Sequence, residues 1–260
     1  MATLTVDENG YLVSQASAEK ITGKWREAAD AVLASCKEHL GDRLIALYIG
    51  GSVATGSAVE GKSDIDCYGV VDLNEAQTKE MEERLKNDRK RIHAAFPFLR
   101  GVEIHLSPVG TISEGRKFQL KLLAAHLYGT DIAEDLPSYK LDKETLGRIR
   151  VSVAKDLEKA RTEFASADNA KIEKAAIWIA KRLLRSAGML VLWKGTTFTM
   201  DPKMLATLFT ISYPEQRESV EKLLALADRG LENKRDTLAL LDSFGTWLIE
   251  EDARVFDPRR

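Results

Sequence analysis

The sequence is poor in the residues that build disulfide frameworks and metal clusters. Its 260 residues include two cysteines, Cys36 and Cys67, and four histidines without metal-binding spacing. Two cysteines are too few for a disulfide scaffold or a zinc cluster. Cys36 falls in a helical pattern and Cys67 in an apolar strand pattern, so both are predicted to be reduced core residues.

Positive charge is also in short supply. Lysine and arginine together number 38, against 40 aspartates and glutamates, which leaves a formal net charge of −2. Proteins that bind nucleic acid normally draw much of their affinity from a basic surface. The composition therefore disfavours nucleic acid as a partner.

Long apolar runs are absent as well. No stretch of the sequence reaches the roughly 18 apolar residues that a membrane-spanning helix needs. Residues 1–15 lack the basic segment and apolar run of a secretion signal. We therefore expect no membrane partner and a cytoplasmic location. Hydrophobic residues make up 44% of the chain and charged residues 30%, which is typical of a globular protein with a packed core.

The first part of the chain alternates between predicted helices and strands. Residues 1–14 show no clear pattern and are predicted to be a loose lead-in. Apolar residues recur at helical spacing over 17–40 and 73–95. Short apolar runs without a helical stripe predict buried strands over 43–49, 64–71 and 102–106.

After Pro108 the pattern changes, and no further strand is predicted. Helical stripes cover 146–164, 172–193, 202–210, 215–227 and 236–249. Glycines and a proline cluster between about residues 110 and 140, which indicates a boundary there. We therefore predict an N-terminal domain of helices and strands over 1–125 and a helical domain over 126–260.

The first strand ends in Gly50-Gly51-Ser52, a sequence suited to contact with a phosphate group. Glycine lets the backbone approach a ligand closely, and Ser52 adds a hydroxyl. Backbone N–H groups at the start of a following helix favour an anion. Gly51, Ser52 and Ser63, which opens the Ser-Asp-Ile-Asp stretch, are the candidates for nucleotide binding in this domain.

Asp64 and Asp66 occupy alternate positions at the start of the second strand. The two-residue period of a strand points both carboxylates to one face, where they repel each other unless a cation bridges them. Oxygen ligands beside a phosphate-binding turn suggest Mg²⁺. Glu103 stands in the apolar third strand, where an acidic group is costly unless it is paired or bound to metal. If the two strands are neighbours, Glu103 completes a carboxylate triad as a metal ligand or as a general base.

Neither motif is specific by itself. An Asp-x-Asp sequence often marks a solvated turn, and glycines commonly end strands. Their order along the chain is much more informative: a strand, Gly-Gly-Ser, a short helix or turn, Ser-Asp-Ile-Asp, and a later strand with a glutamate. This order predicts a site for phosphoryl chemistry.

These residues resemble the nucleotidyltransferase superfamily that includes DNA polymerase β. The signature of that superfamily is a Gly-Ser turn, an Asp-x-Asp strand and a later acidic residue, here Gly51-Ser52, Asp64-Ile65-Asp66 and Glu103. The resemblance implies a mixed sheet flanked by helices, and with the helical C-terminal domain an α+β fold. It also implies two Mg²⁺ ions held by Asp64, Asp66 and Glu103, and transfer of a nucleoside monophosphate to a hydroxyl with loss of pyrophosphate.

The overall layout resembles the aminoglycoside adenylyltransferases of the streptomycin/spectinomycin type. That group also has a small catalytic domain followed by a helical bundle. The glutamate of its Val-Glu-hydrophobic strand is thought to act as the base, and Val102-Glu103-Ile104 matches that strand. The resemblance implies ATP as the nucleotide and a hydroxyl-bearing small molecule as the acceptor, with an aminoglycoside as one candidate.

In the helical domain, Lys181 and Arg185 lie four residues apart and share a helix face. Both side chains suit phosphate, so they are candidates for binding the triphosphate tail. The alternative is a solvated face whose charges pair with acidic residues elsewhere. Sequence alone leaves this choice open.

Three functions are compatible with these motifs. The first is transfer of AMP from ATP to a hydroxyl of a small molecule. The second is nucleotidyl transfer to a protein or a tRNA, in a toxin or regulatory system. The third is an inactive nucleotide-sensing module, which is disfavoured because all three acidic positions are filled.

Overall fold

The computed structural model describes residues 3–166 and 168–256. By their internal contacts these residues form two compact units. The first consists of Tyr11–Tyr139 with the residues up to Asp7, and the second of the chain from Lys140 onward with Glu8–Gly10. The first unit combines helices with a mixed sheet and the second is largely helical, which confirms the predicted α+β class.

A four-stranded sheet forms the centre of the first unit. Its strands lie in the order β5-β4-β3-β6. The β4 and β5 strands run parallel, whereas β3 is antiparallel to both of its neighbours, so the sheet is mixed. The bounds are β3 (Leu44–Gly50), β4 (Ile65–Val71), β5 (Val102–Pro108) and β6 (Ala124–Gly129).

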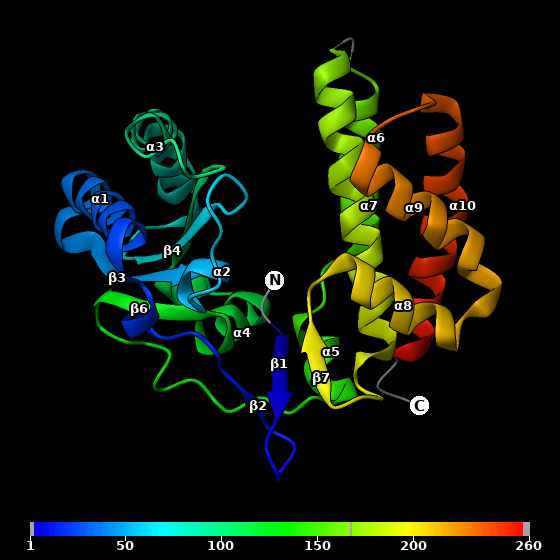
Figure 1. Cartoon of the computed structure of the whole chain (residues 1–260), viewed down its shortest axis with the longest axis horizontal. Coiled ribbons are helices and arrows are strands. Elements are labelled where there is room, and N and C mark those ends of the chain that lie inside the picture. The colour runs from blue at the N-terminus through cyan, green and yellow to red at the C-terminus, as the bar shows by residue number, and fades with distance from the viewer. Residues whose placement is uncertain (1–2, 167, 257–260) are drawn as a thin grey trace. The chain divides into compact units, whose positions relative to one another are not determined.

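Helices cover both faces of this sheet (Figure 1). The larger core lies between the sheet and the helices α1 (Gly23–Leu40) and α3 (Glu75–Ala95). The helix α4 (Glu114–Leu122) packs on the opposite face through Leu120. Alternation along β4 sends Ile65 and Cys67 into the larger core and leaves Asp66 on the α4 side. The shorter elements of this unit are α2 (Gly51–Ala54) and the 3₁₀ turns η1 (Ala18–Lys20), η2 (Gly41–Arg43) and η3 (Val109–Thr111).

The structure contains strands where the sequence predicted none. The segment predicted to be a loose lead-in holds β1 (Thr3–Val6) and β2 (Leu12–Val13), which pair antiparallel. After Pro108, where no strand was predicted, the chain forms β6 and the short β7 (Thr197–Thr199). The β6 sequence is too weakly apolar to predict a strand, and it is extended because it pairs with β3. A domain boundary at residue 125 would cut through β6, whereas the contacts keep the chain together up to Tyr139.

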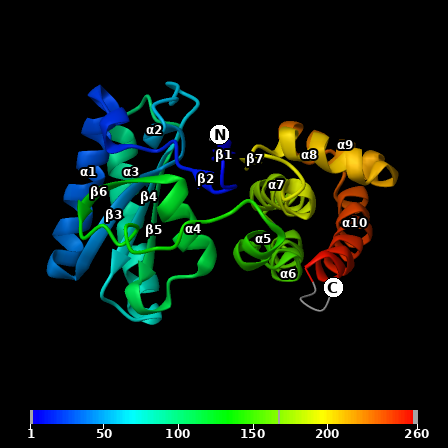
Figure 2. The ribbon, with the colours of Figure 1, turned by 90° about the horizontal axis from the view of Figure 1, so that it is seen from below.

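The second unit is built around α7 (Asn169–Leu192). This helix is apolar on most sides from Ala175 onward and packs against α6, α8, α9 and α10 (Figure 2). One predicted helix, over 146–164, is instead two helices, because Arg150 and Ser152 are extended and the Ser152 side chain caps the second one. The other helices of this unit are α5 (Lys143–Ile149), α6 (Val153–Phe164), α8 (Pro202–Ser212), η4 (Pro214–Gln216), α9 (Arg217–Arg229) and α10 (Lys234–Val255). Among the described residues, no helix is long and apolar enough to cross a membrane.

The two cysteines are predicted to be inert toward thiol reagents in the folded protein. Cys36 and Cys67 are free and fully buried in the larger core. Burial raises the pKa of Cys36 to about 12 and also raises the pKa of Cys67, so neither is a thiolate at pH 8. We expect no labelling by a chromogenic disulfide reagent at pH 8 under native conditions and two thiols per chain after unfolding in guanidinium. Rapid labelling of the native protein would contradict this burial.

Candidate active site

A row of residues across the sheet brings the predicted catalytic acids together. Glu103 on β5 is in register with Asp66 on β4, and Asp66 is in register with Gly50 at the end of β3. Asp64 comes directly before β4, two residues from Asp66. The condition that the sequence left open, that the two acidic strands are neighbours, is therefore met.

Gly51, the first residue after β3, lies directly against the carboxylate of Asp66. Its φ of +66° lies in the left-handed region that side chains disfavour. A Cβ atom added to Gly51 would lie 3.0 Å from Asp66 Oδ2. The Gly51 N–H donates to the carbonyl of Leu123 at 3.3 Å, so it is already used within the protein. Glycine is required here by the backbone conformation and by the close approach to Asp66.

We expect Gly51→Ala to reduce activity far more than it reduces stability. The positive φ should cost about 1 kcal/mol in the free energy of unfolding, and the methyl group should displace the Asp66 carboxylate. Gly41→Ala is the matched control, because Gly41 has a φ of +53° and no atom within 4 Å of its added Cβ. Denaturant unfolding and turnover of both variants separate the two effects. An equal loss of turnover in both variants would show that backbone strain alone is responsible.

Ser52 and Ser63 contact each other beside this turn. The Ser52 hydroxyl donates to Ser63 Oγ at 3.1 Å, and Ser63 Oγ also accepts from the N–H of Val59 at 3.0 Å. Ser63 thus holds the connection between α2 and β4 against the start of α2. The structure brings both predicted serines to the same turn as Gly51.

The charge environment of Asp66 is that of a crowded carboxylate. Burial raises the pKa of Asp66 to about 6, and the negative charges of Asp64 and Glu103 add to this effect. The positive charges of Arg100 and Arg116 oppose it. The site therefore concentrates negative charge on one face of the sheet.

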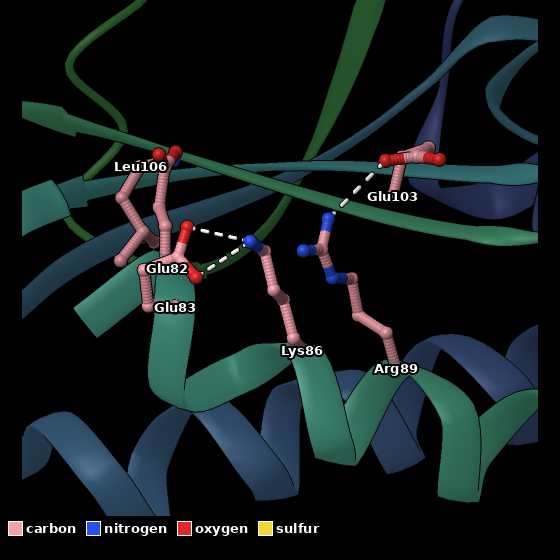
Figure 3. A network of polar contacts seen from close by, with 6 residues as sticks. All are labelled: Glu82, Glu83, Lys86, Arg89, Glu103 and Leu106. Atoms are coloured by element: carbon pink, nitrogen blue, oxygen red, sulfur yellow. Dashed lines mark hydrogen bonds and ion pairs between the residues drawn. The ribbon is translucent and has the colours of Figure 1, made fainter. Parts of the chain in front are cut away.

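Two of the three carboxylates are paired with arginines. Arg100 donates to Asp64 through Nη2. Arg89 extends from α3 to Glu103, with Nη1 3.3 Å from Oε2 (Figure 3). Glu103 itself is exposed, because β5 is the edge strand and its apolar neighbours Val102 and Ile104 take the buried side. The expectation that Glu103 lies inside an apolar strand was therefore wrong, and its pairing with Arg89 was not predicted.

The carboxylates have the chemistry of a magnesium site. Carboxylate oxygens are ligands that Mg²⁺ prefers, and a divalent cation would relieve the repulsion around Asp66. Within residues 3–166 and 168–256, no three His, Cys, Asp or Glu side chains are gathered closely enough to hold a metal ion. In the structure Asp64 and Glu103 face arginines instead. Asp64, Asp66 and Glu103 have the donor chemistry that Mg²⁺ prefers, and two of the three are paired with guanidinium groups in this structure.

A second row of residues lies one step along the strands from the acidic row. His105, Tyr68, Tyr48 and His126 lie in register across β5, β4, β3 and β6. The Tyr68 ring stacks on His105 with centroids 5.9 Å apart, and the guanidinium of Arg116 lies 4.3 Å from the Tyr68 centroid. Tyr68 also lies against Gly50, since an added Cβ there would be 2.5 Å from Tyr68 Cε2. The two-residue strand period could have placed Tyr68 beside Asp66, but no local signal indicates Arg116, Arg89 or Arg100.

The predicted phosphate ligands Lys181 and Arg185 lie in the second unit, on α7. Arg185 Nε donates to the carbonyl of Met200 at 3.3 Å. The neighbouring Arg182 pairs with Asp156 at 2.8 Å. For Arg182 this favours the alternative interpretation, in which the positive charge is paired with an acidic residue of the helical unit. The role of Lys181 and Arg185 stays a prediction.

The chain combines a mixed sheet with a helical unit that follows it in the sequence, and this fold is shared with a solved structure. A solved structure with this fold is that of spectinomycin adenyltransferase AAD(9) from Enterococcus faecialis, with ATP and spectinomycin. It matches with a TM-score of 0.50 and 16% sequence identity, over 86% of this chain and 98% of that chain. No protein-family model and no curated protein sequence matches the chain. At this level of identity the likeness shows the fold alone, so the activity has to be inferred from the site.

Proposed function

We propose that the protein is a Mg²⁺-dependent nucleotidyltransferase that transfers AMP from ATP to a hydroxyl of a small molecule. The observation that supports this proposal is that Asp66 is in register with Glu103 while Gly51 lies against the Asp66 carboxylate. Structural carboxylates are rarely crowded in this way, because their repulsion is unfavourable unless a cation is to be bound.

Each residue of the row has a role in this reaction. Asp64 and Asp66 would hold Mg²⁺, which would neutralise the triphosphate and polarise the α-phosphate. Ser52 and Ser63 border the turn that receives the phosphate tail, and Lys181 and Arg185 are further candidates for binding it. The acceptor oxygen attacks the α-phosphorus, the bond to the bridging oxygen of the β-phosphate breaks, and pyrophosphate leaves. Glu103, exposed at the sheet edge, takes the proton of the attacking hydroxyl.

The acceptor is inferred to be a small molecule. The structural neighbour AAD(9) was solved with ATP and spectinomycin, and the match covers 86% of this chain. A net charge of −2 suits a cationic acceptor such as an aminoglycoside better than it suits tRNA. An aminoglycoside is therefore the first acceptor class to test.

The decisive experiment is an acceptor screen. The purified protein is incubated with Mg²⁺ and each of the four nucleoside triphosphates, in turn with aminoglycosides, other hydroxyl compounds, proteins and tRNA. Pyrophosphate release and mass spectrometry report the transfer. We expect an acceptor whose mass rises by that of an adenylyl group, and loss of the product when EDTA is added.

The other outcomes separate the alternative functions. Adenylylation of a protein or a tRNA, but of no small molecule, would indicate a function in a toxin or regulatory system. Tight binding of MgATP without any transfer would indicate a nucleotide sensor. Failure to bind any nucleoside triphosphate would overturn the proposal as a whole.

A further inference from the structure

The three arginines around the carboxylates differ in how freely they can move. The Arg116 guanidinium stacks on the Tyr68 ring, and its Nη1 is buried without a partner among the described residues. The Arg89 side chain is 21% exposed, whereas that of Arg100 is 62% exposed although its end contacts Asp64. Arg100 is therefore the arginine whose guanidinium can leave its carboxylate without rearranging the core.

The backbone keeps Arg100 beside Asp64 whatever its side chain does. The N–H of Arg100 donates to the carbonyl of Ser63 at 2.9 Å, and the N–H of Ile65 donates to the carbonyl of Gly101 at 3.0 Å. These two hydrogen bonds lie on either side of Asp64 and continue the parallel pairing of β4 with β5. The Arg100 side chain thus starts from a fixed point next to Asp64.

We propose that Arg100 is a further nucleotide-binding residue that exchanges one anion for another. In the free protein its guanidinium holds the Asp64 carboxylate. When Asp64 takes up its role as a ligand of Mg²⁺, Arg100 turns to the phosphate oxygens of the bound triphosphate. This inference rests on the proposed nucleotidyl transfer.

The chemistry of both partners supports the exchange. A guanidinium binds carboxylate and phosphate oxygens with the same planar pair of N–H donors. Retaining Arg100 on Asp64 would place a positive charge beside the incoming divalent cation, which is unfavourable. The triphosphate carries several negative charges into the same place and offers the displaced arginine a new partner. The exchange therefore keeps the charges of Asp64 and Arg100 compensated in both states.

The test compares two affinities of the Arg100→Gln variant. Binding of Mn²⁺ alone is measured by electron paramagnetic resonance, and binding of Mg²⁺ with α,β-methylene-ATP is measured by calorimetry. Removing a competitor from Asp64 should tighten Mn²⁺ binding by about two- to fivefold. Losing a charged hydrogen-bond donor to phosphate should weaken nucleotide binding by on the order of 10- to 100-fold. Arg26→Gln is the matched control, because Arg26 forms an exposed pair with Asp30 on α1.

The opposite signs distinguish exchange from a purely structural role. If Arg100 only supported the fold, the variant would weaken both affinities together and unfold at a lower temperature. Unchanged nucleotide binding in Arg100→Gln would overturn the inference and leave the proposed transfer intact. If the unmodified protein bound neither Mn²⁺ nor the nucleotide, the proposed function itself would fail. An Arg100→Lys variant that recovers only part of the nucleotide affinity would support paired donors rather than charge alone.

Discussion

Asp66→Asn should abolish nucleotidyl transfer and leave the fold intact. Asp66 lies at the centre of the carboxylate row, in register with both Glu103 and Gly50. The substitution removes the negative charge that a metal ion needs there, and with it several kcal/mol of transition-state stabilisation. Turnover should therefore fall by on the order of 10³-fold or more.

The same variant should be at least as stable as the unmodified protein without metal. Asp66 is crowded by the charges of Asp64 and Glu103, so an uncharged amide relieves repulsion. Addition of Mn²⁺ should raise the unfolding temperature of the unmodified protein and not that of the variant. These two measurements separate loss of the metal site from loss of the fold.

Asp72→Asn is the matched control for this substitution. Asp72 follows the other end of the same strand and is exposed. It should keep its turnover and its response to Mn²⁺. A variant at Asp66 with more than about a tenth of normal turnover would exclude the two-metal mechanism.

Glu103→Gln should slow the chemical step and spare the binding of nucleotide. A positioned general base contributes typically about 10²- to 10⁴-fold, so turnover should fall within that range. Glutamine keeps the size of the side chain, and the ion pair lost with Arg89 is exposed on the Glu103 side, where such a pair is worth about 0–1 kcal/mol. Single-turnover kinetics with the identified acceptor, together with calorimetry of the MgATP analogue, test both parts of this expectation.

Glu83→Gln serves as the control for Glu103, because Glu83 lies on α3 close to Arg89 and pairs with Lys86 in solvent (Figure 3). It should leave turnover and nucleotide affinity unchanged. If Glu103→Gln retained normal turnover, Glu103 would not be the base. If it lost nucleotide affinity instead, Glu103 would act mainly as a metal ligand.

The positions of the acidic residues and of the glycine turn were largely predictable, and the reason is local. The period of a strand places Asp64 and Asp66 on one face, and the glycines after β3 mark the turn by their conformational freedom. Glu103 required one assumption, that its strand lies beside β4, and the structure meets it. The arginines were not predictable, because Arg89 reaches Glu103 from a helix 14 residues away and Arg116 reaches Tyr68 from α4.

The sequence by itself determined the class of fold, the long helices, the three apolar strands and the two acids that alternate at the start of β4. Each of these depends on periodicity or spacing within a short segment, which a sequence records directly. Only the tertiary structure decided that Ala124–Gly129 is a strand, because it is extended by pairing with β3 rather than by its own composition. It also decided that Glu103 is exposed and that each outer carboxylate faces an arginine, because burial and charge pairing depend on which distant segments the sheet brings side by side.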